Sequence, residues 1–545
     1  MVRAALLVPL ALAACGSSTS LPVEARCNPL GAGACLAPWP SSAFEVDDPE
    51  TVTGRRLAIP DDAIPRGVRD EEIDPSLWNA LDGFSPTTPI VVEFPGGVSD
   101  LGLPAPDNMD PSLALDSPTV ILDLTTRGRV AHWAELGDDD TTLVLHPAAR
   151  LEPGHRYAVA ITTRVVASDG SELPISPGFR ALLNDRRTDH SLLEAMRGRI
   201  DEVFDALDEA GVTEDLVLAW DFTIASEASL HADLVTARER VIGTLATHPS
   251  LFKATERMGA QVRTLTGTLD APLVLSNGGE PRANTRLVRD EAGQPAIQGL
   301  YRIPFAAVIP ACAGPGAPVV LWGHAPFRDA SDALGATATE LATALCAVVV
   351  GIDLRGRSSA DVPAVERAIA DLGNAGELDV IVQGVVDHVT LIHALPAILG
   401  AVPSQIFYAG PSTVIAALPE LARAAIVDPA SPRSLFVSEL HTYGPIDAVI
   451  VRALVESRWD RVQPRALPHP VLVQAHAGEP TSWIARTFGL PLVDPASTPW
   501  GVRTRRAPHV GSGVVHDLRI ETLREFFTTG QILPAPISGL WPRTP

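Results

Sequence analysis

The chain has 545 residues, of which 46% are hydrophobic and 20% are charged, and its formal net charge is −23 at pH 7. This length is enough for about two or three domains, and the composition is that of a globular protein. The strong negative charge argues against binding to nucleic acid or to an anionic membrane surface, because like charges repel.

The N-terminal segment has the pattern of an export signal. Arg3 precedes an apolar run that is too short to span a bilayer, and the run ends in Leu12-Ala13-Ala14-Cys15. This ending resembles the lipobox of bacterial lipoproteins, which implies a lipid anchor on the cysteine. We therefore predict a signal peptide over residues 1–15 and a tether over 16–26, which would place the protein in the bacterial envelope, at the outer membrane or cell surface. An ordinary secretory signal with an incidental cysteine is the alternative.

Export implies an oxidising compartment, so the remaining cysteines are candidates for disulfides. Cys27 and Cys35 lie close together in a loop-rich stretch and could close a small ring. Cys312 and Cys346 each precede an apolar strand, which would place them at the same edge of a parallel sheet. A second bridge is therefore expected there, with two buried free thiols as the alternative.

Residues 27–180 contain short strand patterns separated by turn signals, among them "TPIVVEF", "TVILDLTT", "TTLVLHP" and "RYAVAITT". This pattern predicts an all-β, sandwich-like domain. The spacing of the apolar residues then changes from that of a strand to that of a helix. In "SLLEAMRGRIDEVFDALDEAG" the apolar residues fall on one helical face, and Gly211 is a stop signal at its end. A strand, "AWDFTIAS", and a second helix follow. Residues 181–258 are accordingly predicted to be a helical connector.

Residues 259–535 alternate apolar strands with helical stretches. An antiparallel pair is expected first, followed by the strands "PVVLWGH", "AVVVGID", "QIFYAG", "AAIVD" and "PVLVQA". Apolar strands that alternate with helices predict a mostly parallel sheet covered on both faces. This is the plan of an α/β-hydrolase domain. No segment after the export signal is expected to span a membrane.

The strand "QIFYAG" leads into a sequence similar to the G-x-S-x-G turn that presents the serine of α/β hydrolases. Here it reads Gly410-Pro411-Ser412-Thr413-Val414. Ester hydrolysis requires an exposed serine, a histidine base oriented by a carboxylate, and N–H groups that meet the oxyanion. The chain order serine, acid, histidine can be filled by Ser412, Glu479 and His516, with His509 as the rival base and Asp428 as the rival acid.

The oxyanion donors would be the N–H groups of Thr413 and Ala325. Each candidate also has a structural interpretation: Ser412 as the cap of a short helix, Glu479 as a surface carboxylate, and His516 as an ordinary loop histidine. His388 and His393 are not spaced to share a helical face for a metal. No metal or nucleotide motif occurs, so no cofactor is predicted.

Several stretches in order resemble secreted α/β-hydrolase lipoproteins of bacteria, which are similar to extracellular lipases with an N-terminal β domain. These stretches are "CNPLGAGACLAPWPSSAF", "AWDFTIAS", "IPACAGPGAPVVLWGH", "GIDLRGRSSADVP", "VIVQGVVDH" and "LREFFTTGQI". The resemblance runs nearly end to end and implies lipase or esterase activity on an acyl ester or lipid-like molecule.

The sequence departs from this family at the positions that carry the chemistry. Ala325 follows His324 where the family has His-Gly, Val414 replaces the last glycine of the serine turn, and Glu479 stands where aspartate is usual. The segment after Ser412 is also shorter than in the family. Two hypotheses follow: a serine ester hydrolase with impaired activity, or a non-catalytic scaffold that binds a lipid, a polymer or an envelope partner.

Overall fold

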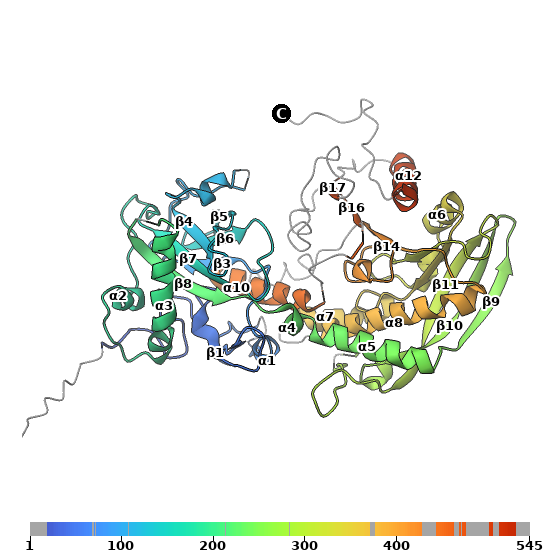
Figure 1. Cartoon of the computed structure of the whole chain (residues 1–545), viewed down its shortest axis with the longest axis horizontal. Coiled ribbons are helices and arrows are strands. Elements are labelled where there is room, and N and C mark those ends of the chain that lie inside the picture. The colour runs from blue at the N-terminus through green and yellow to red at the C-terminus, as the bar shows by residue number, and fades with distance from the viewer. Residues whose placement is uncertain are drawn as a thin grey trace, which may run out of the picture.

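The computed structural model describes residues 19–67, 70, 72–106, 108–212, 214–282, 284–370, 376–427, 443–462, 468–469, 471–475, 501–504 and 512–529. The chain forms two lobes, an N-terminal lobe and a C-terminal lobe that holds the large sheet (Figure 1). Short 3-10 turns punctuate both lobes: η1 (Ser42–Phe44), η2 (Asp110–Leu113), η3 (Asn277–Gly279), η4 (Ala330–Leu334), η5 (Ser359–Asp361), η6 (Ile415–Ala417) and η7 (Arg458–Arg461).

The N-terminal lobe contains small antiparallel sheets around one core. A ribbon and two three-stranded sheets are present: β1 (Glu45–Asp47) with β2 (Arg55–Leu57); β3 (Ile90–Glu93), β6 (Thr142–Pro147) and β5 (His132–Leu136); and β4 (Thr119–Asp123), β7 (Arg156–Thr162) and β8 (Leu216–Thr223). Residues from both three-stranded sheets belong to the same hydrophobic cluster. The strands therefore form one body, and most of them are buried along nearly their whole length.

Helices also contribute to this core, so the prediction of an all-β domain is wrong in that respect. They are α1 (Ser76–Asn79), α2 (Pro177–Leu183) and α3 (Ser191–Glu209). The buried face of α3 carries Leu193, Met196 and Ile200, as the sequence periodicity predicts. Gly211 has φ +74°, a backbone conformation that glycine adopts at no steric cost, just after the helix ends.

The domain boundaries differ from the predicted ones. Helix α3 and strand β8 lie within the predicted connector 181–258, but both pack in the N-terminal lobe, because β8 completes the sheet with β7. The connector is thus a short segment around α4 (Glu227–Leu230). The following helix, α5 (Ala232–Thr247), already packs against the C-terminal lobe.

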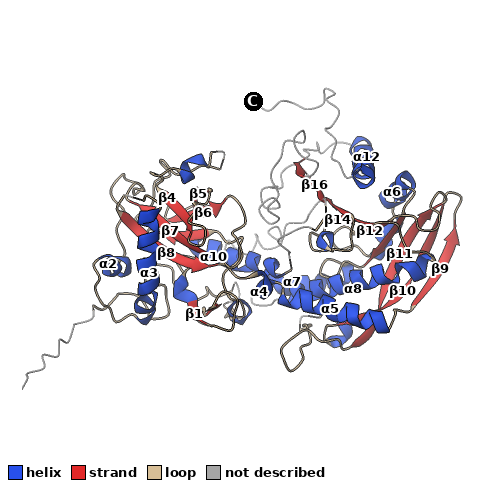
Figure 2. Cartoon of the chain, in the orientation of Figure 1, coloured by secondary structure: helices blue, strands red, loops and turns tan. Residues whose placement is uncertain are grey.

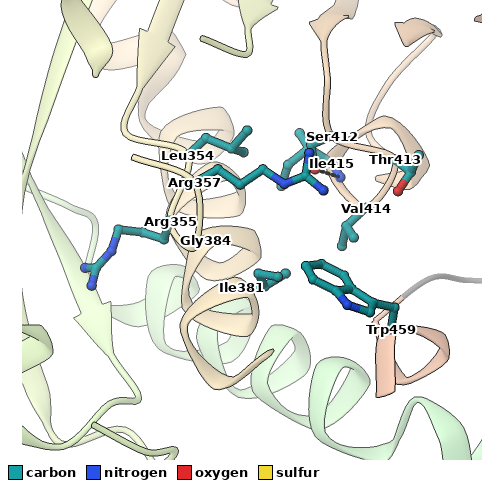
Figure 3. A pocket seen from close by; sticks show the side chains of 10 residues that line it. All are labelled: Leu354, Arg355, Arg357, Ile381, Gly384, Ser412, Thr413, Val414, Ile415 and Trp459. Atoms are coloured by element: carbon teal, nitrogen blue, oxygen red, sulfur yellow. Dashed lines mark hydrogen bonds between the residues drawn. The ribbon is translucent and has the colours of Figure 1, made fainter. Parts of the chain in front are cut away.

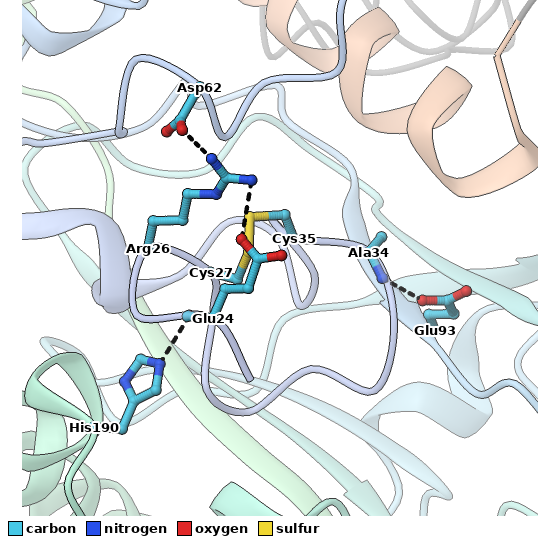
Figure 4. The surroundings of a disulfide bond; sticks show 8 residues. All are labelled: Glu24, Arg26, Cys27, Ala34, Cys35, Asp62, Glu93 and His190. Carbon is cyan, nitrogen blue, oxygen red and sulfur yellow. Dashed lines mark hydrogen bonds and ion pairs between the residues drawn. A yellow bond between two sulfur atoms is a disulfide. The ribbon is translucent and has the colours of Figure 1, made fainter. Parts of the chain in front are cut away.

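The N-terminal segment is held against its lobe (Figure 4). Cys27 and Cys35 form one of the two expected disulfides. Arg26 pairs with Glu24 at 3.0 Å and also contacts Asp62. The predicted tether 16–26 is therefore wrong for residues 19–26, which are bound by hydrogen bonds such as that from Thr19 N–H to the Arg187 carbonyl, 3.0 Å. Cys15 lies outside the described residues.

The C-terminal lobe is built on a nine-stranded sheet. The strand order across it is β17 (Gly501–Thr504), β16 (Val471–Ala475), β15 (Arg423–Val427), β14 (Ile406–Gly410), β12 (Val319–Trp322), β13 (Val348–Ile352), β11 (Gly299–Pro310), β10 (Val262–Leu273) and β9 (Phe252–Met258). The strands from β13 to β17 are parallel, whereas β11 is antiparallel to β13 and to β10. This is the mostly parallel sheet that the sequence predicts.

Helices cover both faces of the sheet (Figure 2). On one face lie α6 (Ala336–Leu345) and α12 (Ser512–Thr529), which share a cluster with Phe407 of β14. On the other lie α5 and α8 (Gly376–Leu399), which share a cluster with Tyr408 of the same strand; α7 (Val362–Ala370) precedes α8. A strand buried on both faces explains the continuous apolar run of β14. The lobe has the layered plan of an α/β-hydrolase fold.

One helix in the described residues, Leu378–Leu399 of α8, is long and apolar enough to cross a membrane, with a mean hydropathy of 1.4. Because 78% of its apolar window is buried inside the protein, it is the core helix of the C-terminal lobe. The second expected disulfide, Cys312–Cys346, joins the end of β11 to the start of β13 in this lobe.

The chain leaves the C-terminal lobe once between β15 and β16. Helix α10 (Pro445–Ser457) packs into the N-terminal lobe, and its apolar residues Ile446, Ile450 and Leu454 belong to the same cluster as the strands there. Trp78 Nε1–H donates to the Leu454 carbonyl, 3.1 Å, and to Ser457 Oγ, 3.0 Å. Residues 259–535 are therefore not one separate domain, since α10 is shared with the other lobe.

Candidate functional site

The carboxyl ends of β12 and β14 meet at one edge of the sheet, where their backbones touch. A Cβ atom placed on Gly410 would lie 2.5 Å from the Gly323 Cα atom, and one on Gly323 would lie 2.4 Å from the Tyr408 hydroxyl. Only glycine fits at both positions. This contact brings the loop that starts with His324 beside the turn that holds Ser412.

The Ser412 turn is a structural turn in this conformation. Ser412 Oγ accepts the Ile415 N–H at 3.2 Å, and the chain then makes one 3-10 turn, η6, before β15 begins. Ser412 does not have a positive φ, so its backbone lacks the strain expected of a serine held out on a sharp elbow. The segment after Ser412 is thus a single three-residue 3-10 turn, and the Ser412 hydroxyl oxygen bonds to its first N–H.

Tyr408 occupies the space beneath the turn. Its hydroxyl oxygen accepts the Ser412 N–H at 2.9 Å, and the side chain is fully buried. Burial raises the pKa of Tyr408 well above its ordinary value. The phenol therefore stays protonated near neutral pH and cannot take a proton from Ser412.

The cavity at Ser412 is small. Its volume is about 20 Å³, and its lining comprises Leu354, Arg355, Arg357, Ile381, Gly384, Ser412, Thr413, Val414, Ile415 and Trp459 (Figure 3). Arg357 extends from the loop after β13 toward the Ser412 turn, with its guanidinium carbon 5.8 Å from the centre of the Trp459 ring. A space of this size holds roughly one water molecule, not an ester substrate.

The predicted oxyanion donors are placed differently from each other. Thr413 is buried beside Ser412 in the cavity lining. Ala325 is exposed, and its N–H points to the Asp332 carboxylate at 3.4 Å. A carboxylate at that N–H disfavours a developing oxyanion, because like charges repel. The Nδ1–H of His324 donates to the Ala325 carbonyl. His324 Nε2 accepts the Leu354 N–H at 2.7 Å.

Three of the four candidate acids and bases lie outside the described residues, and their catalytic roles stay predictions. Strand β16 ends at Ala475, and Glu479 lies outside the described residues, as do Asp428 and His509. His516 was expected just before the last helix, but it lies inside α12, which begins at Ser512.

His388 of α8 has a structural role. His388 is buried, and its Nδ1–H donates to the Gly384 carbonyl at 2.7 Å. Burial lowers its pKa to about 4, so it is neutral at pH 7. Among the residues that the structure describes, no group of three or more His, Cys, Asp or Glu could hold a metal ion.

A polar network lies under the loop that follows β13. The Tyr301 hydroxyl and Gln383 Nε2–H both donate to the carboxylate of Asp387, the latter at 2.8 Å. Arg355 of the cavity lining donates to Asp361 at 3.2 Å and to the Gly279 carbonyl at 2.7 Å. Burial raises the pKa of Asp387 to about 7, although the nearby Arg355 opposes the shift.

This shift predicts a pH dependence of stability. The folded pKa of Asp387 lies above the unfolded value of about 3.9, so its stabilising contribution is complete below about pH 4 and is lost as pH rises toward 7. Asp387→Asn cannot ionise, so the variant should gain stability relative to the wild type between pH 4.5 and pH 8. Urea unfolding of both proteins at pH 4.5 and pH 8 measures this gain. If the difference in their free energies of unfolding is the same at the two pH values, the prediction is contradicted.

Sequence reasoning missed three residues that define this site: Tyr408, Arg357 and Trp459. In the sequence Tyr408 reads only as part of an apolar strand. Arg357 lies in the quoted stretch "GIDLRGRSSADVP" but was given no role. The one available signal was the polar hydroxyl of a tyrosine in a strand that is buried on both faces, since such a group requires a partner.

Comparisons with known proteins give structural likeness only. No protein-family model and no curated protein matches the chain. The chain is similar to acetyl xylan esterase 1 from Thermoanaerobacterium sp., with 12% identity and a TM-score of 0.34, over 55% of this chain and 94% of that chain. An acetyl xylan esterase from Paenibacillus sp. gives 11% identity and a TM-score of 0.33, over 54% and 94%.

A glucuronoyl esterase from Teredinibacter turnerae gives 14% identity and a TM-score of 0.30, over 53% of this chain and 83% of that chain. These neighbours are esterases. At such identities and TM-scores the likeness decides nothing about activity, and the fold assignment rests on the order and direction of the strands.

Proposed function

We propose that this chain is a non-catalytic α/β-hydrolase-fold protein, anchored through Cys15 in a bacterial envelope, which binds a lipid-like molecule without turning it over. The observation that supports a non-catalytic function is the hydrogen bonding of Ser412. Its hydroxyl oxygen accepts the Ile415 N–H at 3.2 Å, and its amide donates to Tyr408 at 2.9 Å. The serine thus fixes the turn between β14 and β15.

The surroundings of Ser412 support the same proposal. Tyr408 stays protonated, and the Ala325 N–H faces a carboxylate. The cavity lining combines apolar side chains with two arginines, Arg355 and Arg357, and such a mixed surface is the kind that an amphiphile contacts.

A second function is favoured by the position of the serine. Ser412 follows β14 at the carboxyl edge of the sheet, and β16 and β17 run parallel to β14. In the corresponding proposal Ser412 attacks an acyl carbonyl, His516 or His509 is the base, and Glu479 orients it, with Thr413 and Ala325 as oxyanion donors. The protein would then be a carboxylic ester hydrolase.

Ester turnover separates these two functions. We expect p-nitrophenyl acetate and butyrate to be hydrolysed by the wild type and by Ser412→Ala at rates within about twofold of each other. A serine that acts in a triad would instead lose about 10³-fold or more of kcat on this substitution. Ser359→Ala, which changes an exposed serine of η5, is the matched control.

A further inference from the structure

Strand β9 is the outer edge of the large sheet, and it pairs on one side only. Figure 1 shows it beyond β10, at the end of the C-terminal lobe. Its residues, Phe252–Met258, run antiparallel to β10, and all of them except Phe252 are exposed. Within the described part of the chain, no strand pairs with its second side. Such an edge is open to an added strand.

The free backbone groups of β9 belong to alternate residues. The Gly259 N–H donates to the Val262 carbonyl at 3.0 Å, and the Asp270 N–H donates to the Leu251 carbonyl at 2.9 Å. The odd-numbered residues of β9 therefore form the hydrogen-bonded pairs with β10. The even-numbered residues turn their N–H and C=O groups away from β10, where no other described residue bonds to them. These residues are Phe252, Ala254, Glu256 and Met258.

The side chains make this edge locally basic. Lys253 and Arg257 lie four residues apart in the strand, so they point to the same face of the sheet. Neither forms an ion pair with a described residue. Glu256, on the other face, is paired with Arg263 at 2.8 Å. Two cations thus stand without an acidic partner on a protein whose net charge is −23, and Lys253 is the only lysine in its sequence.

These cations disfavour a second copy of the strand as the partner. In an antiparallel pair the free groups of the two strands must face each other, so even-numbered residues would lie opposite even-numbered residues. The register that uses all of them places Lys253 of one copy opposite Arg257 of the other. Like charges directly opposite each other destabilise a strand pair. A strand with acidic side chains at those two positions is favoured instead.

We propose that the open edge of β9 binds an extended acidic segment of a partner protein as an added antiparallel strand. Backbone hydrogen bonds to the even-numbered residues provide the attachment. Acidic side chains of the partner, four residues apart, lie opposite Lys253 and Arg257. Both positions fall in non-hydrogen-bonded pairs, in which opposed side chains come closest, so each carboxylate can reach its cation. On the other face, apolar side chains of the partner cover Phe252 and Met258, of which Met258 is 78% exposed.

A designed peptide tests the preference for an acidic strand. Fluorescein-labelled Val-Glu-Val-Thr-Val-Glu-Val has the length of β9 and carries its glutamates four residues apart. Full-length protein should bind it at least about tenfold more tightly than the same peptide with lysines in place of the glutamates, as fluorescence anisotropy measures. The preference should weaken at high salt, because exposed charges are screened.

Reversal of both cations tests the two residues. The double variant Lys253→Glu/Arg257→Glu should bind the glutamate peptide at least about tenfold more weakly than the wild type does, and it should prefer the lysine peptide. Both side chains are exposed, so the variant should fold, which circular dichroism checks. Arg302→Glu, which changes an exposed arginine of β11, is the matched control and should bind as the wild type does.

Ala254→Pro tests the backbone pairing. The Ala254 N–H faces the open edge, so proline removes a donor of the proposed contact without removing a hydrogen bond to β10. The glutamate peptide should bind this variant at least about tenfold more weakly than the wild type. An affinity equal to that of the wild type in a folded Ala254→Pro protein would show that the peptide does not pair with the edge.

The single lysine allows the position of the peptide to be read. A carbodiimide joins an amine to a carboxylate in contact with it and takes up the water that is lost. It should cross-link the glutamate peptide to Lys253, as peptide mapping by mass spectrometry would show. Lys253→Arg retains the charge but lacks the amine, so it should bind the peptide without this cross-link.

Three outcomes overturn the proposal. They are equal affinity of the wild type for the two peptides, undiminished binding of the glutamate peptide by the folded double variant, and cross-links between two chains through Lys253 in the absence of peptide. The last would assign the edge to a second copy. None of these measurements involves Ser412, so they are independent of the result for ester turnover.

Discussion

Asp361→Ala is expected to destabilise the C-terminal lobe by about 3–5 kcal/mol, because it breaks a buried ion pair and leaves its partner charge in place. Asp361 is fully buried and accepts hydrogen bonds from Arg355 Nε, the Gly356 N–H and the Ser358 hydroxyl. These bonds fold the loop that carries Arg357 to the Ser412 cavity. Urea unfolding followed by circular dichroism measures the loss.

An exposed ion pair is the matched control for this substitution. Glu280 pairs with Arg282 at 2.7 Å, and both side chains are about two-thirds exposed (66% and 65%). Glu280→Ala should cost no more than about 1 kcal/mol. Equal losses for the two variants would show that the loop does not depend on the buried carboxylate.

Gly410→Ala is expected to destabilise the same lobe by about 3 kcal/mol or more, at the upper end of what overpacking costs. The added Cβ atom would lie 2.5 Å from Gly323 Cα and 2.6 Å from the Tyr408 hydroxyl. Backbone is the main obstacle, so no rotamer change can relieve it. The substitution should push β12 and β14 apart and disturb the Ser412 turn.

Gly198→Ala is the control, because it is expected to stabilise the protein. Gly198 lies within α3, and a Cβ atom added there would meet nothing within 4 Å. Alanine should stabilise the helix by about 0.5–1 kcal/mol. A Gly410→Ala protein as stable as Gly198→Ala would contradict the close backbone approach at the sheet edge.

The central strands were predictable because a strand that is buried on both faces has an apolar side chain at nearly every position. Strands such as β13 and β14 are covered on both faces and read as continuous apolar runs. Strand β9 was missed because its side chains, "FKATERM", are mostly exposed and it is held by backbone pairing with β10. Strand β17 is only four residues long, too short for a period to show.

The path of α10 could not be predicted. Its sequence, "PIDAVIVRALVES", has helical periodicity, but an apolar helical face does not identify the core it packs against. Trp78, which donates a hydrogen bond to Leu454 of α10, lies 376 residues earlier in the chain. The same holds for the strand β8, whose place in a sheet depends on β7 and not on its neighbours in sequence.

At the site, sequence located Ser412 at the end of β14 but not its conformation. The motif records which residue stands at the turn, whereas the bond from Ile415 N–H and the support of Tyr408 depend on the fold. Val414 and the short following segment were the available signs of a structural turn. The positions of Glu479 and His509 lie outside the described residues, and their catalytic roles stay predictions.

The most direct test of the proposal that Ser412 is structural is reaction with a fluorophosphonate probe, read by intact mass on the wild type and on Ser412→Ala. A serine whose hydroxyl oxygen accepts a hydrogen bond within its own turn should give no adduct in the folded wild type under conditions that label a control serine esterase fully. An adduct on the wild type that is absent from Ser412→Ala would show an activated nucleophile and contradict the account.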